Sequence, residues 1–192
     1  MERQMQTLLL RLAHESILEE LDHIESSTYL TLLVEEDPLL QQKLGVFVTL
    51  KKYDLTHTKS RILRGCIGTI EGVSRVVEAI YHLSKESAFD DPRFLPLSRE
   101  EYENIHIKIS LLSPLKEINT IDEIILGTHG VVYEYRHHRA LFLPEVAIEQ
   151  HWGVQKLLNQ LCIKASLPPE HYLYNEGKLS IFTVESFEDE RG

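Results

Sequence analysis

Apolar residues recur at three- and four-residue steps in three stretches of the chain. This spacing places them on one stripe of a helix, so it predicts three amphipathic helices. The first spans Gln4–Ile24, the second follows Ser74 as its cap and reaches Ala88, and the third starts at Val154 and ends before Pro168. Each helix is expected to pack its apolar stripe against other elements.

Runs rich in β-branched and aromatic residues predict the strands of a sheet. The run at 105–112 alternates apolar and polar side chains, which is typical of a half-exposed strand. Residues 51–61 are polar and would form the long tip of a first hairpin, and residues 136–139 would separate the arms of a second. The predicted strands are 46–50, one that begins at Ile62, 105–112, 131–135, 140–143 and 179–187.

A short helical turn is predicted just before the strand at 105. Ser98 and Glu101 stand three residues apart, as in a capping box, and Leu97 and Tyr102 are placed to form a hydrophobic staple. Strands joined by hairpins and interleaved with helices indicate an α+β fold, with a mostly antiparallel sheet flanked by amphipathic helices. With 192 residues, 43% of them hydrophobic, the chain is expected to form one folding unit with room for two lobes.

The chain is acidic: 30 Asp and Glu residues against 20 Lys and Arg residues give a formal net charge of -10. This charge repels nucleic acids and anionic membranes, so we expect neither as a partner. Two cysteines do not make a disulfide framework, no secretory signal pattern opens the sequence, and no apolar run approaches the ~20 residues that span a bilayer. The sequence therefore predicts a soluble, cytoplasmic protein.

Ten histidines raise the question of a bound metal. None of them lies in an HExxH pattern or pairs with a CxxC, which are the spacings typical of metal sites. The segment from Gly65 to Gly68 lacks both the length and the lysine of a phosphate-binding loop. We therefore predict no metal site and no cofactor.

The most chemically distinctive stretch reads ILRGCIGTI. It frames Cys66 with Gly65 and Gly68 and places Arg64 two positions before the thiol. A cysteine attacks electrophiles as a thiolate, which nearby cations stabilise, so this stretch could supply a nucleophilic or substrate-holding thiol. It could equally place a small buried side chain between glycines that allow close strand packing. Cys162 lies on the apolar stripe of the third helix and is expected to be a packing residue.

Five sequence blocks form a recognisable set: GVFVTL at 45–50, LRGCIGT at 63–69, DPRF at 91–94, SLLSP at 110–114 and FLPEVAIEQHW at 142–152. Together they resemble the AMMECR domain family, also called AmmeMemoRadiSam system protein A, of which LRGCIG is the signature. The resemblance spans roughly Leu8 to Phe187. Residues 1–192 are therefore expected to be a single AMMECR-type domain.

The resemblance implies a compact α+β domain with a larger and a smaller lobe, and with the signature near a cleft between them. It also implies two partners, a Memo-like protein, which is related to metal-dependent dioxygenases, and a radical-SAM protein. It implies no particular reaction.

The resemblance and the chemistry of the side chains together single out candidate residues for such a cleft. The catalytic candidates are Cys66, Arg64, His129 and Glu145. The candidates for binding a small organic substrate are Gly65, Gly68, Thr69, Arg93, Gln150 and Trp152.

Three of these candidates also have purely structural explanations. Glu145 follows a proline at a predicted helix start, where the helix dipole favours a carboxylate. Trp152 could be a core or lobe-interface aromatic. Arg93 could pair with one of its neighbouring carboxylates, Asp90, Asp91 or Glu86.

Two functional hypotheses follow. In the first, the protein is an enzyme or enzyme component in which Cys66 is a nucleophile or a substrate-holding thiol and Arg64 tunes it. In the second, it is an adaptor whose signature surface docks the Memo-like or radical-SAM partner, and the cysteine is merely small. Nucleic-acid regulation is a third possibility that the net charge of -10 disfavours.

Overall fold

The structure is a computed structural model, and it describes residues 1–24, 27–33, 35, 37–53, 61–174 and 176–189. The chain forms two compact units. Unit 1 comprises residues 1–111 together with the residues from 185 onward, and unit 2 comprises residues 112–184. Unit 2 is therefore an insertion in the sequence of unit 1.

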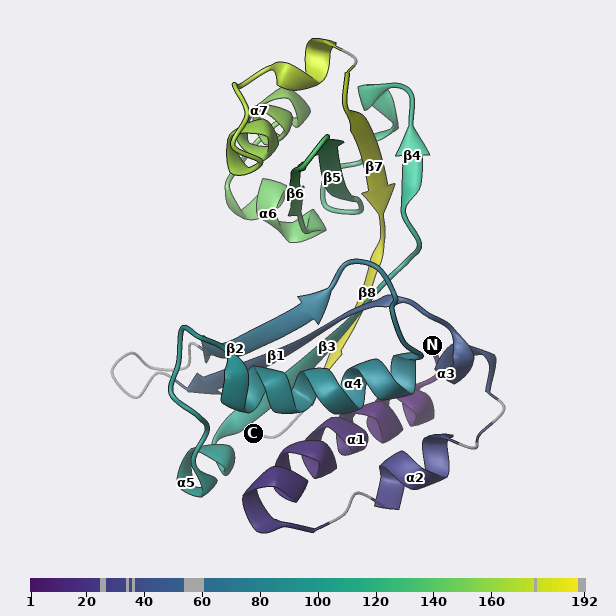
Figure 1. The fold of residues 1–192 in the computed structure, drawn as a ribbon, viewed down its shortest axis with the longest axis vertical. Helices are drawn as coiled ribbons and strands as arrows, with labels where there is room; N and C mark the ends of the chain where they lie inside the picture. The colour runs from purple at the N-terminus through teal and green to yellow at the C-terminus, as the bar shows by residue number, and fades with distance from the viewer. Residues whose placement is uncertain (25–26, 34, 36, 54–60, 175, 190–192) are drawn as a thin grey trace. The chain divides into compact units, whose positions relative to one another are not determined.

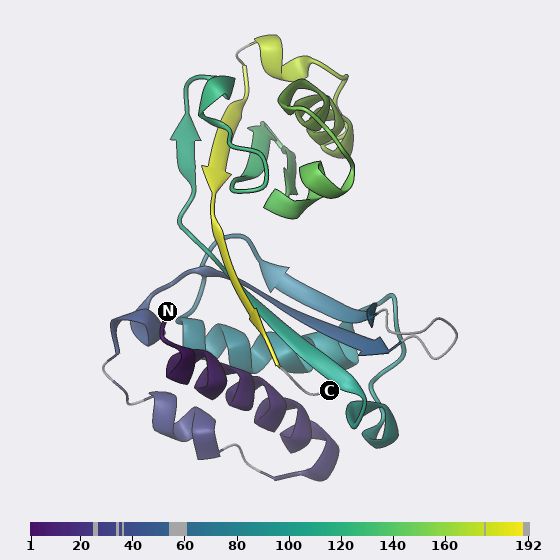
Figure 2. The same ribbon diagram turned by 180° about the vertical axis from the view of Figure 1, so that it is seen from behind.

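Unit 1 consists of a four-stranded sheet with helices on one face (Figures 1 and 2). The strand order is β2-β1-β3-β8, which makes β2 an edge strand. Its elements are α1 (Arg3–Asp22), α2 (Ser27–Leu33), α3 (Pro38–Gln41), β1 (Gly45–Tyr53), β2 (Arg61–Thr69), α4 (Val76–Lys85), the π-helical turn η1 (Glu86–Asp90), α5 (Arg99–Tyr102), β3 (Ile105–Leu112) and β8 (Val184–Glu188).

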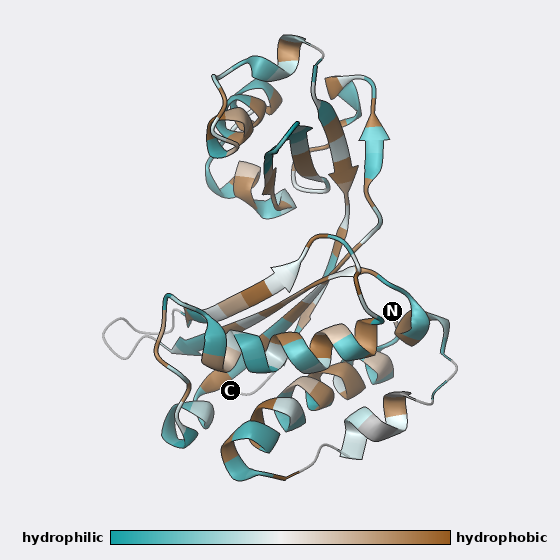
Figure 3. Cartoon of the chain, viewed as in Figure 1, coloured by the Kyte–Doolittle hydropathy of each residue, from teal (hydrophilic) through white to brown (hydrophobic). Residues whose placement is uncertain are grey.

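The core of unit 1 forms where the apolar stripes of α1 and α4 meet the sheet. Both helices carry hydrophobic residues on one side and hydrophilic residues on the other (Figure 3). Each large aliphatic side chain that is fully buried contributes about 1.5–3 kcal/mol, which fixes the helices on the sheet. The buried residues of these elements include Leu9, Leu12 and Ile17 of α1, Val76, Val77 and Ile80 of α4, and Val46, Val48 and Leu50 of β1.

The hairpin of β1 and β2 is antiparallel and contains one irregularity. Leu50 pairs with Gly65 and the next residue, Lys51, pairs with Leu63, so Arg64 is an extra residue on β2. This is the arrangement of a β-bulge, which re-aims the side chain of the bulged residue. The bulge lies two residues before Cys66.

Unit 2 contains its own four-stranded sheet in the order β4-β7-β5-β6, and the three pairings are antiparallel. Its core includes Leu157, Leu161 and Cys162 of α7, packed with Val131 and Tyr133 of β5. The elements are β4 (Lys116–Ile118), the 3₁₀ turn η2 (Ile121–Glu123), β5 (Gly130–Tyr135), β6 (His138–Phe142), α6 (Pro144–Glu149), α7 (Val154–Lys164), the 3₁₀ turn η3 (His171–Tyr174) and β7 (Lys178–Phe182).

The predicted α+β class is confirmed, as are the three amphipathic helices and the two hairpins. The capping box is also confirmed: the Ser98 hydroxyl accepts a hydrogen bond from the Glu101 N–H, and the Glu101 carboxylate accepts one from the Ser98 N–H. Leu97 and Tyr102, the predicted staple, are both buried.

Several boundaries differ from the prediction. The single strand predicted at 179–187 is wrong, because the chain leaves one sheet at Phe182 and enters the other at Val184. The predicted single sheet is therefore two sheets. Lys51 to Tyr53 continue β1, and the remaining tip of that hairpin, residues 54–60, lies outside the described residues.

Two further differences concern capping and burial. Arg75, not Ser74, occupies the N-cap position of α4, where its N–H donates to Glu78. Strand β3 is buried on both faces rather than half-exposed, because His106 and Ser110 find polar partners there, at Asp189 and Ser186.

Candidate functional site

Cys66 lies in the middle of β2, directly opposite Thr49 on β1. Val48 and Leu50 point into the core, so the alternation of side chains along a strand places Thr49 and Cys66 on the other face, away from the helices of unit 1. The Thr49 Oγ1 and the Cys66 Sγ are 3.2 Å apart, within hydrogen-bonding distance. The thiol is half-buried.

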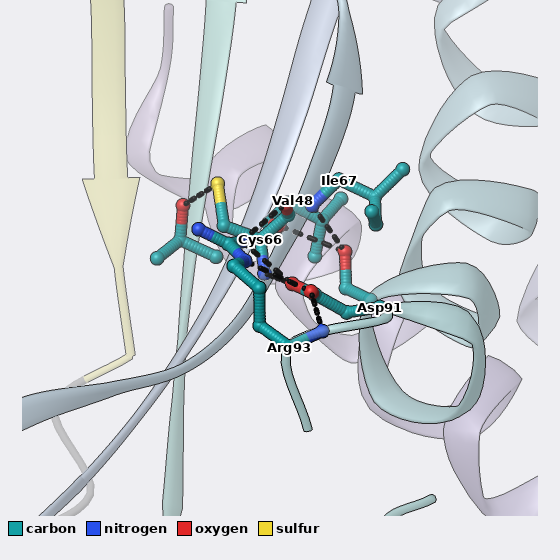
Figure 4. A network of polar contacts seen from close by, with 7 residues as sticks. Val48, Cys66, Ile67, Asp91 and Arg93 are labelled. Atoms are coloured by element: carbon teal, nitrogen blue, oxygen red, sulfur yellow. Dashed lines mark hydrogen bonds and ion pairs between the residues drawn. The ribbon is translucent and has the colours of Figure 1, made fainter. Parts of the chain in front are cut away.

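The backbone of Cys66 is held by an Asp91–Arg93 pair (Figure 4). The Cys66 N–H donates to the Asp91 carboxylate at 2.8 Å, and the Cys66 carbonyl accepts from Nη2 of Arg93 at 3.1 Å. Arg93 also donates to the same carboxylate through Nε at 2.9 Å and Nη2 at 2.7 Å. Both polar groups of this edge-strand residue are thus satisfied from outside the sheet.

Ser87 in η1 joins the same network on the other side. Its hydroxyl donates to the Val48 carbonyl at 2.9 Å and accepts from the Ile67 N–H at 3.0 Å. Val48 and Ile67 are opposite each other across β1 and β2, so the serine hydroxyl bridges the two strands. The π-helical turn after α4 is what brings Ser87 and Asp91 to β2.

The two glycines beside Cys66 are required by close packing. A Cβ on Gly65 would lie 2.1 Å from the Ser87 carbonyl oxygen, and a Cβ on Gly68 would lie 2.4 Å from the Phe47 ring. Gly65 therefore lets η1 approach the strand, and Gly68 makes room for an aromatic side chain. These contacts account for both glycines without a ligand.

The Asp91 carboxylate is buried but strongly stabilised as an anion. Hydrogen bonds from the Arg93 guanidinium and from the N–H groups of Cys66 and Arg93 hold the pKa of Asp91 well below its usual range, against the opposing effect of burial. Arg93, whose side chain is 53% exposed, places its guanidinium against the backbone carbonyl of Cys66. The alternative that Arg93 pairs with a neighbouring carboxylate is confirmed for Asp91.

Arg64 is buried and is bound to α5. It donates to both Glu101 oxygens, through Nε at 3.1 Å and Nη2 at 2.8 Å, and to the Leu95 carbonyl at 2.9 Å. The hydrogen bonds from Arg64 lower the pKa of Glu101 to about 2, although partial burial acts against them. Arg64 thus anchors the bulge of β2, and no hydrogen bond in the described part of the chain joins it to the Cys66 thiol.

The low pKa of Glu101 predicts a pH dependence of stability. Its stabilising pair with Arg64 is complete above the ordinary pKa of 4.5 and is lost as the pH falls toward about 2, because protonation removes the acceptor charge. We expect urea midpoints to fall between pH 5 and pH 3 less steeply in Glu101→Gln than in the wild type. The exposed neighbour Glu100 supplies the control, Glu100→Gln, which should follow the wild type. Equal slopes for the wild type and Glu101→Gln would contradict this role.

Three further candidates, Thr69, His129 and Trp152, have identifiable local contacts. Thr69 ends β2 opposite Val46. His129 accepts a hydrogen bond from the Ile125 N–H at its Nδ1, which closes a turn. Trp152 packs edge-on against Phe142, with ring centroids 5.6 Å apart, as the aromatic-packing alternative predicted.

The last two candidates, Glu145 and Gln150, lie at the two ends of α6 in unit 2. Glu145 is half-buried in the first turn of α6, the position that the helix dipole favours, and Gln150 is exposed at the C-cap of that helix. The candidate residues predicted from the sequence therefore lie in both units, whereas the polar network around Cys66 belongs to unit 1 alone.

Three residues of the network were missed as site residues, namely Thr49, Ser87 and Asp91. Asp91 was considered only as a partner of Arg93, although its place in the DPRF block was a usable signal. Thr49 and Ser87 carried no such signal, because only the strand register and the π-helical turn bring them to Cys66.

In the described part of the chain, no group of three or more His, Cys, Asp or Glu side chains is arranged to hold a metal ion. Among its helices there is also none with the length and apolar character needed to cross a membrane.

Comparison with known proteins places the chain in a family. The sequence model of the AMMECR1 family matches residues 10–187, nearly the whole chain and both units. The chain belongs to the AMMECR1 family. The match includes β2 with its LRGCIG signature and the Asp91–Arg93 pair.

Relatives from archaea cover most of this AMMECR1-family chain. Protein PH0010 of Pyrococcus horikoshii is 35% identical over 187 residues, which cover 95% of this chain and 88% of the relative. Protein MJ0810 of Methanocaldococcus jannaschii is 34% identical over 82% of this chain and 80% of its own length. The crystal structure of PH0010, described as an uncharacterized protein, superposes with a TM-score of 0.78 at 36% identity, over 95% of this chain and 90% of that chain.

Proposed function

We propose that this AMMECR1-family protein is an enzyme or enzyme component that uses Cys66 to act on, or to hold, a small organic substrate. In this proposal it works together with a Memo-like protein and a radical-SAM protein. The polar network of unit 1 is the reacting end of the site, and Arg93 is the group that receives an acidic part of the substrate.

The observation that carries this proposal is the contrast between the two cysteines. Cys162 is fully buried in the apolar core of unit 2, where burial raises the pKa of its thiol. Cys66 is half-buried, belongs to neither core cluster and lies against a threonine hydroxyl. A cysteine used only as a small hydrophobe is expected in surroundings like those of Cys162.

The backbone contacts of Cys66 also support a working thiol. The Asp91–Arg93 pair fixes the N–H and the carbonyl of Cys66, so the thiol projects from a rigid strand. Arg93 donates to Asp91 through Nε and Nη2, and in this proposal its Nη1 donates to the substrate. A guanidinium held in this way is suited to bind a carboxylate or phosphate.

Replacing Cys66 with serine should abolish turnover or retention of substrate, because serine is a far weaker nucleophile at neutral pH. The free energy of unfolding should change by no more than about 0.5 kcal/mol, since the side chain is half-buried and close to isosteric. The measurement is mass spectrometry of small molecules consumed or retained when the protein is mixed with its Memo-like and radical-SAM partners. Cys162→Ala is the control and should keep the activity. Full activity in Cys66→Ser would refute the proposal.

A second candidate, a non-catalytic adaptor, is favoured by a different observation. Ile62 and Leu63 on β2 and Leu95 beside Arg64 are exposed apolar side chains next to the signature. The packing explanation for Gly65 and Gly68 also fits this candidate.

The adaptor candidate predicts the opposite outcome of substitution. Cys66→Ala would be tolerated, whereas Leu95→Asp would weaken association with the Memo-like or radical-SAM partner in a pull-down. Loss of binding in Leu95→Asp with full function in Cys66→Ala would establish the adaptor.

A further inference from the structure

The sulfur of Cys66 forms a hydrogen bond with the hydroxyl of Thr49. The Thr49 Oγ1 and the Cys66 Sγ face each other across the ladder that pairs β1 with β2, at 3.2 Å. Among the described residues, no other side chain forms a hydrogen bond with this sulfur, and the Thr49 hydroxyl forms none with any other group. Both side chains are half-buried, so the contact lies at the surface of the sheet rather than in the core.

The polar network outside the sheet explains why these two side chains meet. The N–H of Cys66 donates to Asp91 and its carbonyl accepts from Arg93, so both groups point away from β1. Thr49 and Cys66 are therefore a non-hydrogen-bonded pair of the antiparallel ladder. In pairs of this type the Cα atoms approach to about 4.5 Å and the side chains lie closest to each other. The register that offers the strand edge to Asp91 and Arg93 also brings the hydroxyl to the sulfur.

The direction of this hydrogen bond depends on the state of the sulfur. A neutral thiol can donate to the hydroxyl or accept from it. A thiolate has no proton and can only accept, so the Thr49 O–H must donate to it. A hydrogen bond to a charged group is stronger than one to its neutral form, and it therefore favours the charged form. The hydroxyl thus stabilises the state of Cys66 that attacks electrophiles.

Threonine is suited to hold this donor in place. Its branched Cβ restricts rotation about χ1, so little side-chain freedom is lost when the hydrogen bond forms. Val48 and Leu50, the neighbours of Thr49 on β1, are fully buried in the core of unit 1 and fix the strand on either side. Oγ1 is therefore held by a rigid strand as well as by its own stiff side chain.

The charged groups beside Cys66 compensate each other. The Asp91 carboxylate accepts from the Cys66 N–H, and the Arg93 guanidinium donates both to Asp91 and to the Cys66 carbonyl. Hydrogen bonds to Asp91 raise the pKa of Arg93, and the charge of a Cys66 thiolate raises it further. The charge of the guanidinium is thus shared between two anions, whereas the Thr49 hydroxyl is directed to the sulfur.

We propose that Thr49 is a positioning residue for Cys66. Its hydroxyl donates to the thiolate, increases the share of the reactive form, and holds the sulfur on the face of the sheet that points away from the helices of unit 1. This inference rests on the chemistry proposed for Cys66 and names a residue on which that chemistry depends. Thr49 acts through the sulfur and is not required to touch the substrate.

Three substitutions of Thr49 separate the role of its hydroxyl from that of its methyl group. The measurement is the rate at which iodoacetamide alkylates Cys66 in the folded protein at neutral pH, followed by intact-protein mass spectrometry. Thr49→Val and Thr49→Ala lack the hydroxyl and should react on the order of tenfold more slowly than the wild type. Thr49→Ser keeps the hydroxyl and should react like the wild type. The ultraviolet absorbance of the thiolate should fall in Thr49→Val and Thr49→Ala and be retained in Thr49→Ser.

Two further measurements keep this test decisive. Thermal unfolding shows whether each variant keeps the fold, and Thr49→Val retains the branched shape of threonine even where Thr49→Ala loosens the strand. Thr7→Val is the matched control, because its hydroxyl donates to the Arg3 carbonyl on the exposed side of α1, and it should react like the wild type.

The inference about Thr49 and the proposal for Cys66 fail in different ways. If Thr49→Val and Thr49→Ala are alkylated as fast as the wild type, the role of Thr49 is overturned and the reactive thiol stands. The role is also overturned if Thr49→Ser is as slow as Thr49→Ala, because the methyl group then accounts for the effect. A wild-type Cys66 that reacts only after denaturation overturns both.

Discussion

Replacing Asp91 with asparagine should lower the free energy of unfolding by about 3 kcal/mol. The carboxylate is almost fully buried and accepts four hydrogen bonds, from the N–H of Cys66 and from the N–H, Nε and Nη2 of Arg93. Asparagine has the same size, but its NH₂ group would face N–H donors and it cannot neutralise the guanidinium. Urea unfolding at pH 7 measures the difference.

The adjacent Asp90 supplies a matched control for this substitution. Asp90 is exposed, so Asp90→Asn should change the free energy of unfolding by no more than about 0.5 kcal/mol. The difference in the free energy of unfolding between Asp91→Asn and Asp90→Asn should become smaller as the pH is lowered. The pKa of Asp91 is lowered by folding, so its contribution is present above the ordinary carboxyl range and is lost on acidification. If Asp91→Asn is as stable as Asp90→Asn, the network does not hold β2.

Replacing Gly65 with alanine should be the most damaging substitution in the signature, at about 3 kcal/mol or more. The new Cβ would lie 2.1 Å from the backbone oxygen of Ser87, and a backbone atom cannot rotate away as the end of a side chain can. The π-helical turn would have to separate from β2, which would break the bridge from Ser87 to Val48 and Ile67.

Gly153→Ala is the control for the glycine substitution, because nothing lies within 4 Å of a Cβ at that position. Its effect should stay within about 0.5 kcal/mol. Thermal unfolding of the two variants separates a close-packing role of Gly65 from the general cost of replacing glycine. An unchanged Tm for Gly65→Ala would mean that η1 does not pack on β2 as closely as described.

Much of the fold could be predicted because its elements are encoded locally. The stripes of α1, α4 and α7 follow helical spacing, and Ser98 with Glu101 marks a helix start within four residues. The prediction of a single strand at 179–187 was wrong because it also relied on local sequence alone. No glycine, proline or other turn residue interrupts the sequence around Thr183, and only the pairing of β7 and β8 with different sheets divides it.

The candidate site was only partly predictable. Cys66 and Arg93 carry chemistry that stands out in the sequence, but Asp91, which binds the backbone N–H of one and the guanidinium of the other, does not. Its contact with Cys66 depends on the π-helical turn that ends α4, and five-residue turns of this kind have no periodic signal. Arg64 was expected to tune the thiol, but the bulge in β2 directs it to Glu101 instead.

The measurement that tests the role of Cys66 most directly is alkylation of the folded protein by iodoacetamide at neutral pH. Intact-protein mass spectrometry follows the reaction, and Cys162 serves as the internal control. The account predicts that Cys66 reacts on the order of 100-fold faster than Cys162, which is fully buried and has a raised thiol pKa. If Cys66 stays as unreactive as Cys162 until the protein is denatured, the thiol is a packing group and the proposed chemistry at Cys66 is wrong.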